Sequence, residues 1–197
     1  MANTKQIVDI AYREIVEKGY YDEIKGNAPI PGLMQDSMSS IPKSMTDYIN
    51  ECGYGCCFVF SAYMMDILNR YNINCYMIGT VEDSATRASV MYEDNGVFYI
   101  ANPVEDIEYF TKNNIKQEDR ADYYVGNSAT MIIDGIEHND SRFTIEDFYK
   151  KYGKIWIIGS MNKEAITTLY DSLSTCANRI IMPPEIANYD TNSLLKK

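Results

Sequence analysis

The chain has 197 residues, of which 46% are hydrophobic, and a formal net charge of −10 at pH 7. A chain of this length is typical of one domain and can bury a core without disulfides or metal ions. The acidic charge argues against nucleic acid and anionic membrane surfaces as partners, because both repel a negatively charged protein.

The first residues, Met1 to Gln6, are not a basic segment followed by an apolar run, and no stretch has about 20 successive apolar residues. We therefore expect a cytoplasmic protein that does not engage a membrane. The odd number of cysteines argues against a complete disulfide framework. The five cysteines are Cys52, Cys56, Cys57, Cys75 and Cys176.

Hydrophobic spacing predicts helices in the first third of the chain. Thr4–Lys18 has apolar residues at helical spacing and is followed by a glycine. Gly26–Pro42 is rich in glycine, proline and asparagine and is expected to be a loop, and Ser44–Asn50 a short helix. Cys56–Tyr71 is small or apolar on nearly all sides, which predicts a buried helix.

Strand patterns follow this buried helix. Ile73–Val81, Ser89–Tyr92 and Val97–Ala101 read as strands, the last two joined by a turn that contains Asn95-Gly96. Lys154–Ile158 is expected to be a further strand, and Trp156 a core residue of a central strand. Three more helices are expected, at Val104–Asn114, Thr144–Tyr152 and Asn162–Leu173. Tyr123–Ile133 is expected to be irregular chain that leads into a strand, and Asn178–Lys197 a C-terminal extension.

This order of elements predicts an α+β fold in which an antiparallel sheet packs on helices. We expect residues 1–180 to form a single domain and residues 181–197 to form a C-terminal arm or tail.

The segment Gly53-Tyr54-Gly55-Cys56-Cys57 is the most informative in the chain. A thiolate is the nucleophilic form of cysteine, and the positive end of a helix lowers the pKa of a thiol. Glycines before a helix let backbone N–H groups approach a substrate carbonyl. The alternative is that Cys56 and Cys57 are small core residues, since free cysteine is often buried.

The sequence from about residue 50 to residue 105 resembles transglutaminase-like domains of the papain-like cysteine enzyme superfamily, and more distantly arylamine N-acetyltransferases. In these families a glycine-preceded cysteine opens a helix, a later strand begins with the catalytic histidine, and the strand after it ends in aspartate. The hairpin Val90–Pro103 is similar to that last pair of strands.

The resemblance implies a papain-like/transglutaminase-like fold, in which a buried cysteine helix packs on an antiparallel sheet. It places Cys57 as the nucleophile and Asn102 as the residue that orients a histidine. Asparagine suits this task, because papain-like enzymes use a Cys-His-Asn arrangement. The family histidine falls at Arg87 or Ala88, and neither side chain accepts a proton at neutral pH.

Three explanations for the missing histidine compete with a false family match. The chain is a natural pseudoenzyme that uses the cleft for binding, or the natural residue is histidine and Ala88 is an inactivating substitution. In the third explanation His138, the only histidine of the chain, reaches the site from another loop. Its neighbours instead suggest a solvated turn.

The resemblance implies a cysteine-type acyl-transfer or amide/peptide hydrolase scaffold that acts on an amide or thioester carbonyl. Without the histidine it should be inactive or impaired by at least about 10²–10⁴-fold. The alternative is a non-catalytic module that binds a peptide or small ligand on the same fold.

The expected partner is a peptide, a protein or a small acyl substrate, and no cofactor is expected. A metal site is not expected, because the cysteine spacing does not match paired-cysteine sites. The residues that such a site would need are Cys52, Cys56, Cys57 and His138.

Overall fold

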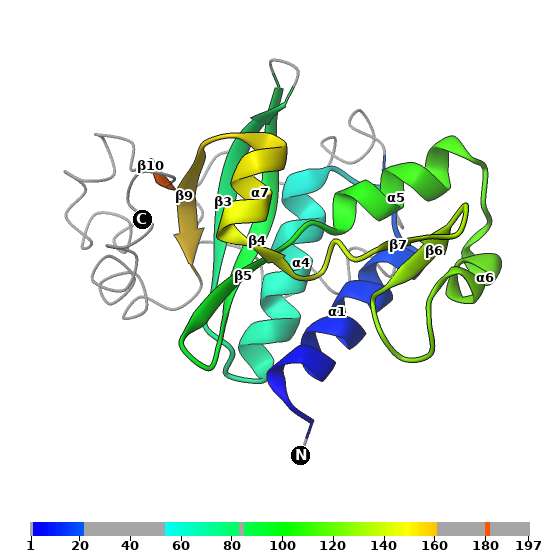
Figure 1. The fold of residues 1–197 in the computed structure, drawn as a ribbon, viewed down its shortest axis with the longest axis horizontal. Coiled ribbons are helices and arrows are strands. Elements are labelled where there is room, and N and C mark those ends of the chain that lie inside the picture. The colour runs from blue at the N-terminus through cyan, green and yellow to red at the C-terminus, as the bar shows by residue number, and fades with distance from the viewer. Residues whose placement is uncertain (1, 22–53, 83–84, 161–179, 182–197) are drawn as a thin grey trace.

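The computed structural model describes residues 2–21, 54–82, 85–160 and 180–181 (Figure 1). The expected loop Gly26–Pro42 and the expected helices Ser44–Asn50 and Asn162–Leu173 lie outside these residues. None of the helices in the described ranges is long and apolar enough to cross a membrane.

A six-stranded sheet forms the centre of the fold, with the strand order β10-β9-β3-β4-β5-β8. Neighbouring strands are antiparallel except β9 and β10, which pair in parallel. Helices packed on an antiparallel sheet confirm the predicted α+β class. The strands are β3 (Cys75–Glu82), β4 (Ala85–Asp94), β5 (Val97–Ala101), β8 (Phe143–Thr144), β9 (Ile155–Ser160) and β10 (Ile180–Ile181).

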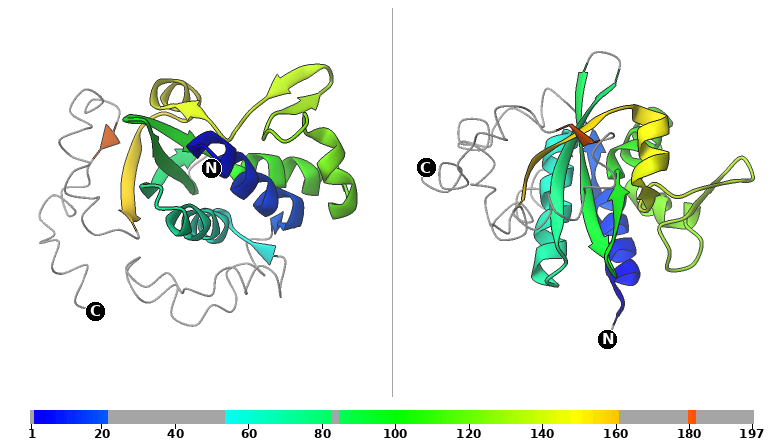
Figure 2. Two further views of the ribbon diagram at one scale, coloured as in Figure 1. Left: turned by 90° about the horizontal axis from the view of Figure 1, so that it is seen from below. Right: turned by 60° about the vertical axis from the view of Figure 1, so that its left-hand side comes forward.

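Helices cover both faces of this sheet, and Figure 2 shows α4 and α7 on opposite sides. Side chains alternate along β4, so Val90 and Tyr92 join the core that contains α4, while Met91 joins the core that contains α7. The first core also takes in α1 and α5. These helices are α1 (Thr4–Lys18), α4 (Cys57–Arg70), α5 (Pro103–Lys112) and α7 (Ile145–Tyr152).

Short elements complete the described part of the chain. A parallel pair joins β1 to β2, and an antiparallel hairpin joins β6 to β7. The hairpin was predicted only in its first strand. Its turn at Asp134-Gly135 has positive φ at both residues, as a two-residue hairpin turn requires. The elements are β1 (Tyr20–Tyr21), β2 (Tyr54–Gly55), α6 (Gln117–Arg120), η2 (Ala121–Tyr123), β6 (Met131–Ile133) and β7 (Ile136–His138).

The hairpin of β4 and β5 forms as the sequence predicts, but β4 is longer than expected. Asn95 and Gly96 have φ values of 53° and 79°, which is the geometry that the Asn-Gly pair favours. Strand β4 begins at Ala85 rather than Ser89, so Arg87 and Ala88 lie within a strand. They pair with Thr80 and Gly79 of β3.

Trp156 lies on β9, the second strand from the sheet edge and not a central one, and it is half-buried. It pairs with Gly79, where a Cβ atom would lie 2.5 Å from the indole ring. Only glycine leaves room for the indole ring against β3 at this point.

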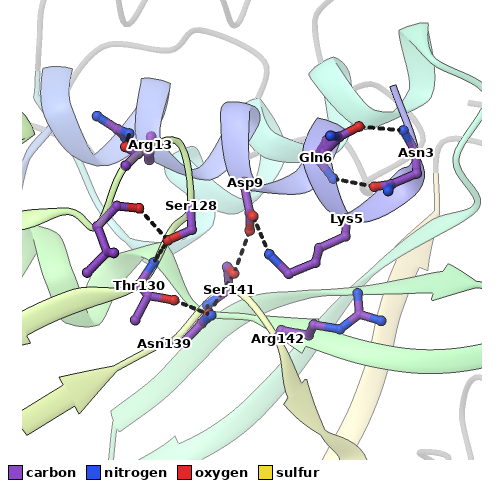
Figure 3. Close-up of polar contacts among 12 residues, drawn as sticks. Asn3, Lys5, Gln6, Asp9, Arg13, Ser128, Thr130, Asn139, Ser141 and Arg142 are labelled. Atoms are coloured by element: carbon purple, nitrogen blue, oxygen red, sulfur yellow. Dashed lines mark hydrogen bonds and ion pairs between the residues drawn. The ribbon is translucent and has the colours of Figure 1, made fainter. Parts of the chain in front are cut away.

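Polar contacts from distant parts of the chain hold α1. Figure 3 shows Asp9 of α1 between Lys5 and Ser141, whose Oγ donates to Asp9 Oδ1 at 3.2 Å. At the other end of the helix, Arg120 is fully buried and donates to the carbonyl oxygens of Val16 (2.6 Å) and Gly19. The guanidinium thereby satisfies carbonyl groups that a helix end leaves without partners.

The middle of α1 is held by three side chains that we call the tyrosine–aspartate cluster: Tyr12, Asp106 and Tyr124. The Tyr12 hydroxyl donates to Asp106 Oδ2 at 2.8 Å, and the Tyr124 hydroxyl donates to the same oxygen at 3.2 Å. Burial and nearby acidic groups raise the pKa of Asp106 well above its ordinary value. The cluster ties α1 and α5 to the chain before β6.

Candidate functional site

Helix α4 begins at Cys57, one residue after the predicted start, and Cys56 is its N-cap residue with an extended backbone. Gly55 precedes them at the end of β2. A Cβ atom at Gly55 would lie 3.0 Å from the side chains of Val59 and Phe60, so a larger residue would push the chain away from the helix. The glycine therefore allows the close approach that brings the thiols to the start of α4.

A pocket at the start of α4, the thiol pocket, brings together all four of the expected site residues. Cys57 comes from α4, Arg87 and Ala88 come from β4, and Asn102 follows β5. The unoccupied space has a volume of about 10 Å³, which is room for about one water molecule. The lining residues are Cys57, Thr80, Arg87, Ala88, Asn102, Val104, Glu105, Glu108 and Tyr152.

Unequal strand lengths create this pocket. The pairing of β4 with β5 stops where Val90 meets Ala101, while β4 extends back to Ala85. The chain turns at Asn102-Pro103 into α5, and the first turns of this helix line the pocket beside the part of β4 that does not pair with β5. The sheet is thus open at the point where α4 begins.

Arg87 and Glu108 form an ion pair across the pocket. The Arg87 Nη1 atom lies 2.9 Å from Glu108 Oε1, and the side chains are 23% and 18% exposed. Glu108 also contacts Lys112, one turn further along α5. Position 87, one of the two positions at which the resemblance led us to expect a histidine, therefore holds a side chain that stays protonated and has an acidic partner.

Asn102 reaches the pocket, but its amide faces Tyr152 and not Arg87. The Asn102 Nδ2 atom lies 3.5 Å from the Tyr152 hydroxyl, which itself donates to Glu105 Oε1 at 2.8 Å. Burial and the Glu105 charge raise the pKa of Tyr152 far above its ordinary value. The Asn102 backbone N–H donates to the Asp140 carbonyl at 2.8 Å, which fixes this turn.

The two thiols of the site differ in their ionisation. A hydrogen bond from Cys57 lowers the pKa of Cys56 to about 6 in spite of its burial, helped by the backbone N–H groups of Phe58 and Val59. The same hydrogen bond between the two thiols, together with burial, raises the pKa of Cys57. The Ala88 backbone and the Arg87 charge act in the opposite direction.

His138 lies at the end of β7, is exposed, and does not line the thiol pocket. It therefore has no contact with the site in this structure. Of the residues that a metal site would need, Cys52 lies outside the described part of the chain. Within that part, no group of three or more His, Cys, Asp or Glu side chains is placed to hold a metal ion.

Sequence reasoning missed Glu105, Glu108 and Tyr152. In the structure the first turns of α5 are not simply solvated, because Asp106 is buried and the two glutamates line the pocket. Their spacing of three residues on a helix that begins with a proline was the available signal, because it places both carboxylates on one face.

Comparisons with protein-family models, with curated proteins and with solved structures find no match to this chain.

Proposed function

We propose that this chain is a cysteine-type acyl-transfer or amide hydrolase scaffold of the transglutaminase-like, papain-like class, with Cys57 in the nucleophile position. The observation that carries the proposal is the meeting of Cys57, Arg87, Ala88 and Asn102 at one pocket. These residues lie on a helix start, an inner strand and the end of the next strand, in the order that the resemblance implies.

In this proposal Cys57 attacks the carbonyl carbon of an amide or thioester carried by a peptide or small acyl compound. Backbone N–H groups at the start of α4 stabilise the oxyanion that forms. Arg87 occupies the position of the base, stays protonated at neutral pH and is held by Glu108. The scaffold is therefore impaired in general acid–base catalysis as it stands.

Arg87 is a better site than Ala88 for restoring a histidine. The Ala88 side chain is only 4% exposed and packs in the core with Cys56 and Val59, so an imidazole there would overpack the interior. The side chain at position 87 already lines the pocket and already has Glu108 as a hydrogen-bond acceptor.

The test is the Arg87→His variant, assayed for hydrolysis of a small thioester and of a matched amide. We expect a gain of at least about 10² over the wild type, in line with general base catalysis. The gain should vanish when Cys57→Ser is added. Arg87→Lys is the matched control, because it keeps the positive charge and supplies no base.

A second candidate is a non-catalytic module that binds a peptide or small ligand in the same pocket. The ion pair between Arg87 and Glu108 favours it, because it leaves the pocket with a protonated side chain where a general base would be needed. If Arg87→His folds like the wild type and gains nothing, and iodoacetamide leaves Cys57 unlabelled in the native protein, the binding module replaces the enzyme proposal. The net charge of −10 would then suit a cationic partner.

A further inference from the structure

Asn102 occupies a helix N-cap position, but its side chain does not cap the helix. It precedes Pro103, the first residue of α5, and makes no side-chain capping hydrogen bond. Asparagine is among the best N-cap residues, because its side-chain oxygen can accept a hydrogen bond from the first turn. Asn3, the N-cap residue of α1, accepts such a bond from the Gln6 backbone N–H at 2.9 Å. The Asn102 side chain therefore gives up a contact that would stabilise its helix.

The Asn102 side chain lies instead in the thiol pocket, where only 6% of the residue is exposed. The Asp140 carbonyl and the Tyr12 hydroxyl bond to its backbone on the other side. The Tyr152 hydroxyl gives its proton to Glu105 at 2.8 Å, so its oxygen can only accept from Asn102 Nδ2, which lies 3.5 Å away. These contacts fix the amide and turn its nitrogen, and not its oxygen, towards the hydroxyl that lines the pocket.

An amide nitrogen carries two protons, and this one has a partner for only one of them. Among the described residues, the Tyr152 hydroxyl is the only hydrogen-bond partner of the Asn102 side chain, and 3.5 Å is long for such a bond. The two hydroxyl groups that line the pocket are already used, because Tyr152 donates to Glu105 and Thr80 donates to the Tyr152 carbonyl at 3.0 Å. Asn102 is thus the uncharged side chain of this lining that keeps an N–H for a ligand.

The space beside these groups has the size of one oxygen atom. Its volume of about 10 Å³ is room for about one water molecule, and Cys57 lines it together with Asn102. The oxygen of a carbonyl group that Cys57 attacks would be of this size. An N–H group fixed beside such a space before the reaction begins is the arrangement that stabilises a developing oxyanion.

The charged groups of the lining do not oppose a negative oxygen. Glu108 lies 2.9 Å from Arg87 and 3.3 Å from Lys112. Glu105 lies 3.8 Å from Lys151 and also accepts the hydrogen bond from Tyr152. Because each carboxylate has at least one cationic partner, the surroundings of the space have little net negative charge.

We propose that Asn102 is a catalytic residue whose Nδ2–H donates a hydrogen bond to the carbonyl oxygen of the acyl group that Cys57 attacks. This inference rests on the proposed function of Cys57 as the nucleophile. It gives Asn102 a different task from orienting a histidine, which neither position 87 nor position 88 supplies.

The step balances without a proton from Asn102. Cys57 attacks a thioester as the thiolate, after its proton has passed to water, and its sulfur bonds to the carbonyl carbon. The π electron pair moves to the oxygen, and the hydrogen bond from Asn102 strengthens with the charge. The pair then returns, the carbon–sulfur bond of the thioester breaks, and the departing sulfur leaves as a thiolate.

Two rates measured on the same thiol test this role. Acylation of Cys57 by a small acetyl thioester develops an oxyanion, whereas iodoacetamide reacts at its methylene carbon and develops none. We expect Asn102→Ser and Asn102→Asp each to lower the ratio of the acylation rate to the alkylation rate by about 10²–10³. The ratio cancels any change in the fraction of thiolate. Serine and aspartate are good N-cap residues, so both variants should fold.

Asn3→Ser is the matched control, because Asn3 is also an N-cap asparagine but does not line the pocket. It should leave both rates unchanged. A further measurement needs no variant: a dithioester replaces the carbonyl oxygen by sulfur, which is larger and accepts a weaker hydrogen bond. Relative to a free thiol in solution, the wild type should prefer the thioester over the dithioester by at least about tenfold.

Two failures can be told apart in these experiments. If Cys57 is acylated but the rate ratio is unchanged in both Asn102 variants, or the wild type shows no preference for the thioester, the role of Asn102 is wrong and the proposed function stands. If the thioester acylates Cys57 neither in the wild type nor in Arg87→His, the proposed function is wrong, and the role of Asn102 with it.

Discussion

Two polar clusters, the tyrosine–aspartate cluster and the thiol pocket, meet at Asn102, and they differ in how far they are buried from water. The backbone of Asn102 faces the tyrosine–aspartate cluster, where the Tyr12 hydroxyl lies 3.3 Å from its carbonyl oxygen. Its side chain faces the thiol pocket and Tyr152. The first cluster is sealed, with Tyr12 and Asp106 at most 3% exposed. The second holds half-buried ion pairs around a small open space.

This difference gives the two clusters different roles: the tyrosine–aspartate cluster stabilises the fold, and the thiol pocket holds the groups of the proposed chemistry. A sealed polar cluster whose members satisfy one another fixes how helices pack, and it is costly to disturb. The groups of the thiol pocket keep partial contact with water, so each is worth less to stability and is freer to react. We expect substitutions in the first cluster to lower the free energy of unfolding and those in the second to change thiol reactivity.

The largest effect should come from Asp106→Ala. The change removes the acceptor of two buried tyrosine hydroxyls, and each unsatisfied group costs about 1–3 kcal/mol, so we expect a loss of about 4 kcal/mol. Asp106→Asn keeps an oxygen acceptor and should lose far less. Urea denaturation measures both, and equal losses in the two variants would show that the hydrogen bonds are not the cause.

Asp140 should give the next largest effect, through pH. Its pKa is raised to about 6, mainly by burial, against the opposing charge of Lys151. The unfolded state therefore loses this proton first as the pH rises from about 4 to 6, and the free energy of unfolding falls over that window by up to about 3 kcal/mol. Asp140→Asn should remove this fall, as denaturation at several pH values would show. A wild type whose stability rises through the same window would contradict the assignment.

A matched pair of substitutions compares the two clusters directly. Tyr12→Phe removes a buried hydroxyl from Asp106 and should cost about 2 kcal/mol, while Tyr152→Phe removes a half-buried hydroxyl and should cost about 0.5 kcal/mol. Thermal unfolding measures the difference. If Tyr152→Phe is the more damaging, the thiol pocket is part of the scaffold and the contrast fails.

The smallest effect is expected outside both clusters. Lys116 and Glu118 are 3.9 Å apart and more than 70% exposed, so water screens their attraction. Lys116→Gln should change the free energy of unfolding by less than about 0.5 kcal/mol. A larger loss would mean that exposed pairs matter in this acidic protein and that the buried clusters explain less of its stability.

Patterns local to the sequence predicted much of the fold. The helical spacing in Thr4–Lys18 was read correctly, as were the helix expected over Thr144–Tyr152, to within one residue, and the Asn95-Gly96 turn. Each depends on residues that are neighbours in the chain, so one sequence contains the signal. Strand β8 was not predicted, because two residues that pair across the sheet carry no periodicity of their own.

In the candidate site, too, local sequence patterns predicted some features, and contacts between distant residues could not be predicted. Glycine spacing before Cys57 and the family resemblance placed four residues that the structure brings to one pocket. The partners of those residues could not be predicted, because the bond between Arg87 and Glu108 joins β4 to α5 and depends on how these elements pack. One sequence also cannot show which of two adjacent thiols faces the core, and the structure buries Cys56 and leaves Cys57 half-buried at the pocket.

The buried contact between Arg120 and the end of α1 has a consequence for synthesis on the ribosome. The carbonyl groups that receive this guanidinium, those of Val16 and Gly19, are made about a hundred residues earlier. At about 5–20 residues per second, the first helix waits roughly 5–20 s for the side chain that completes it. The apolar face of α1 is covered earlier, once α4 has been made up to Arg70, so it is the end of this helix that stays incomplete for longest.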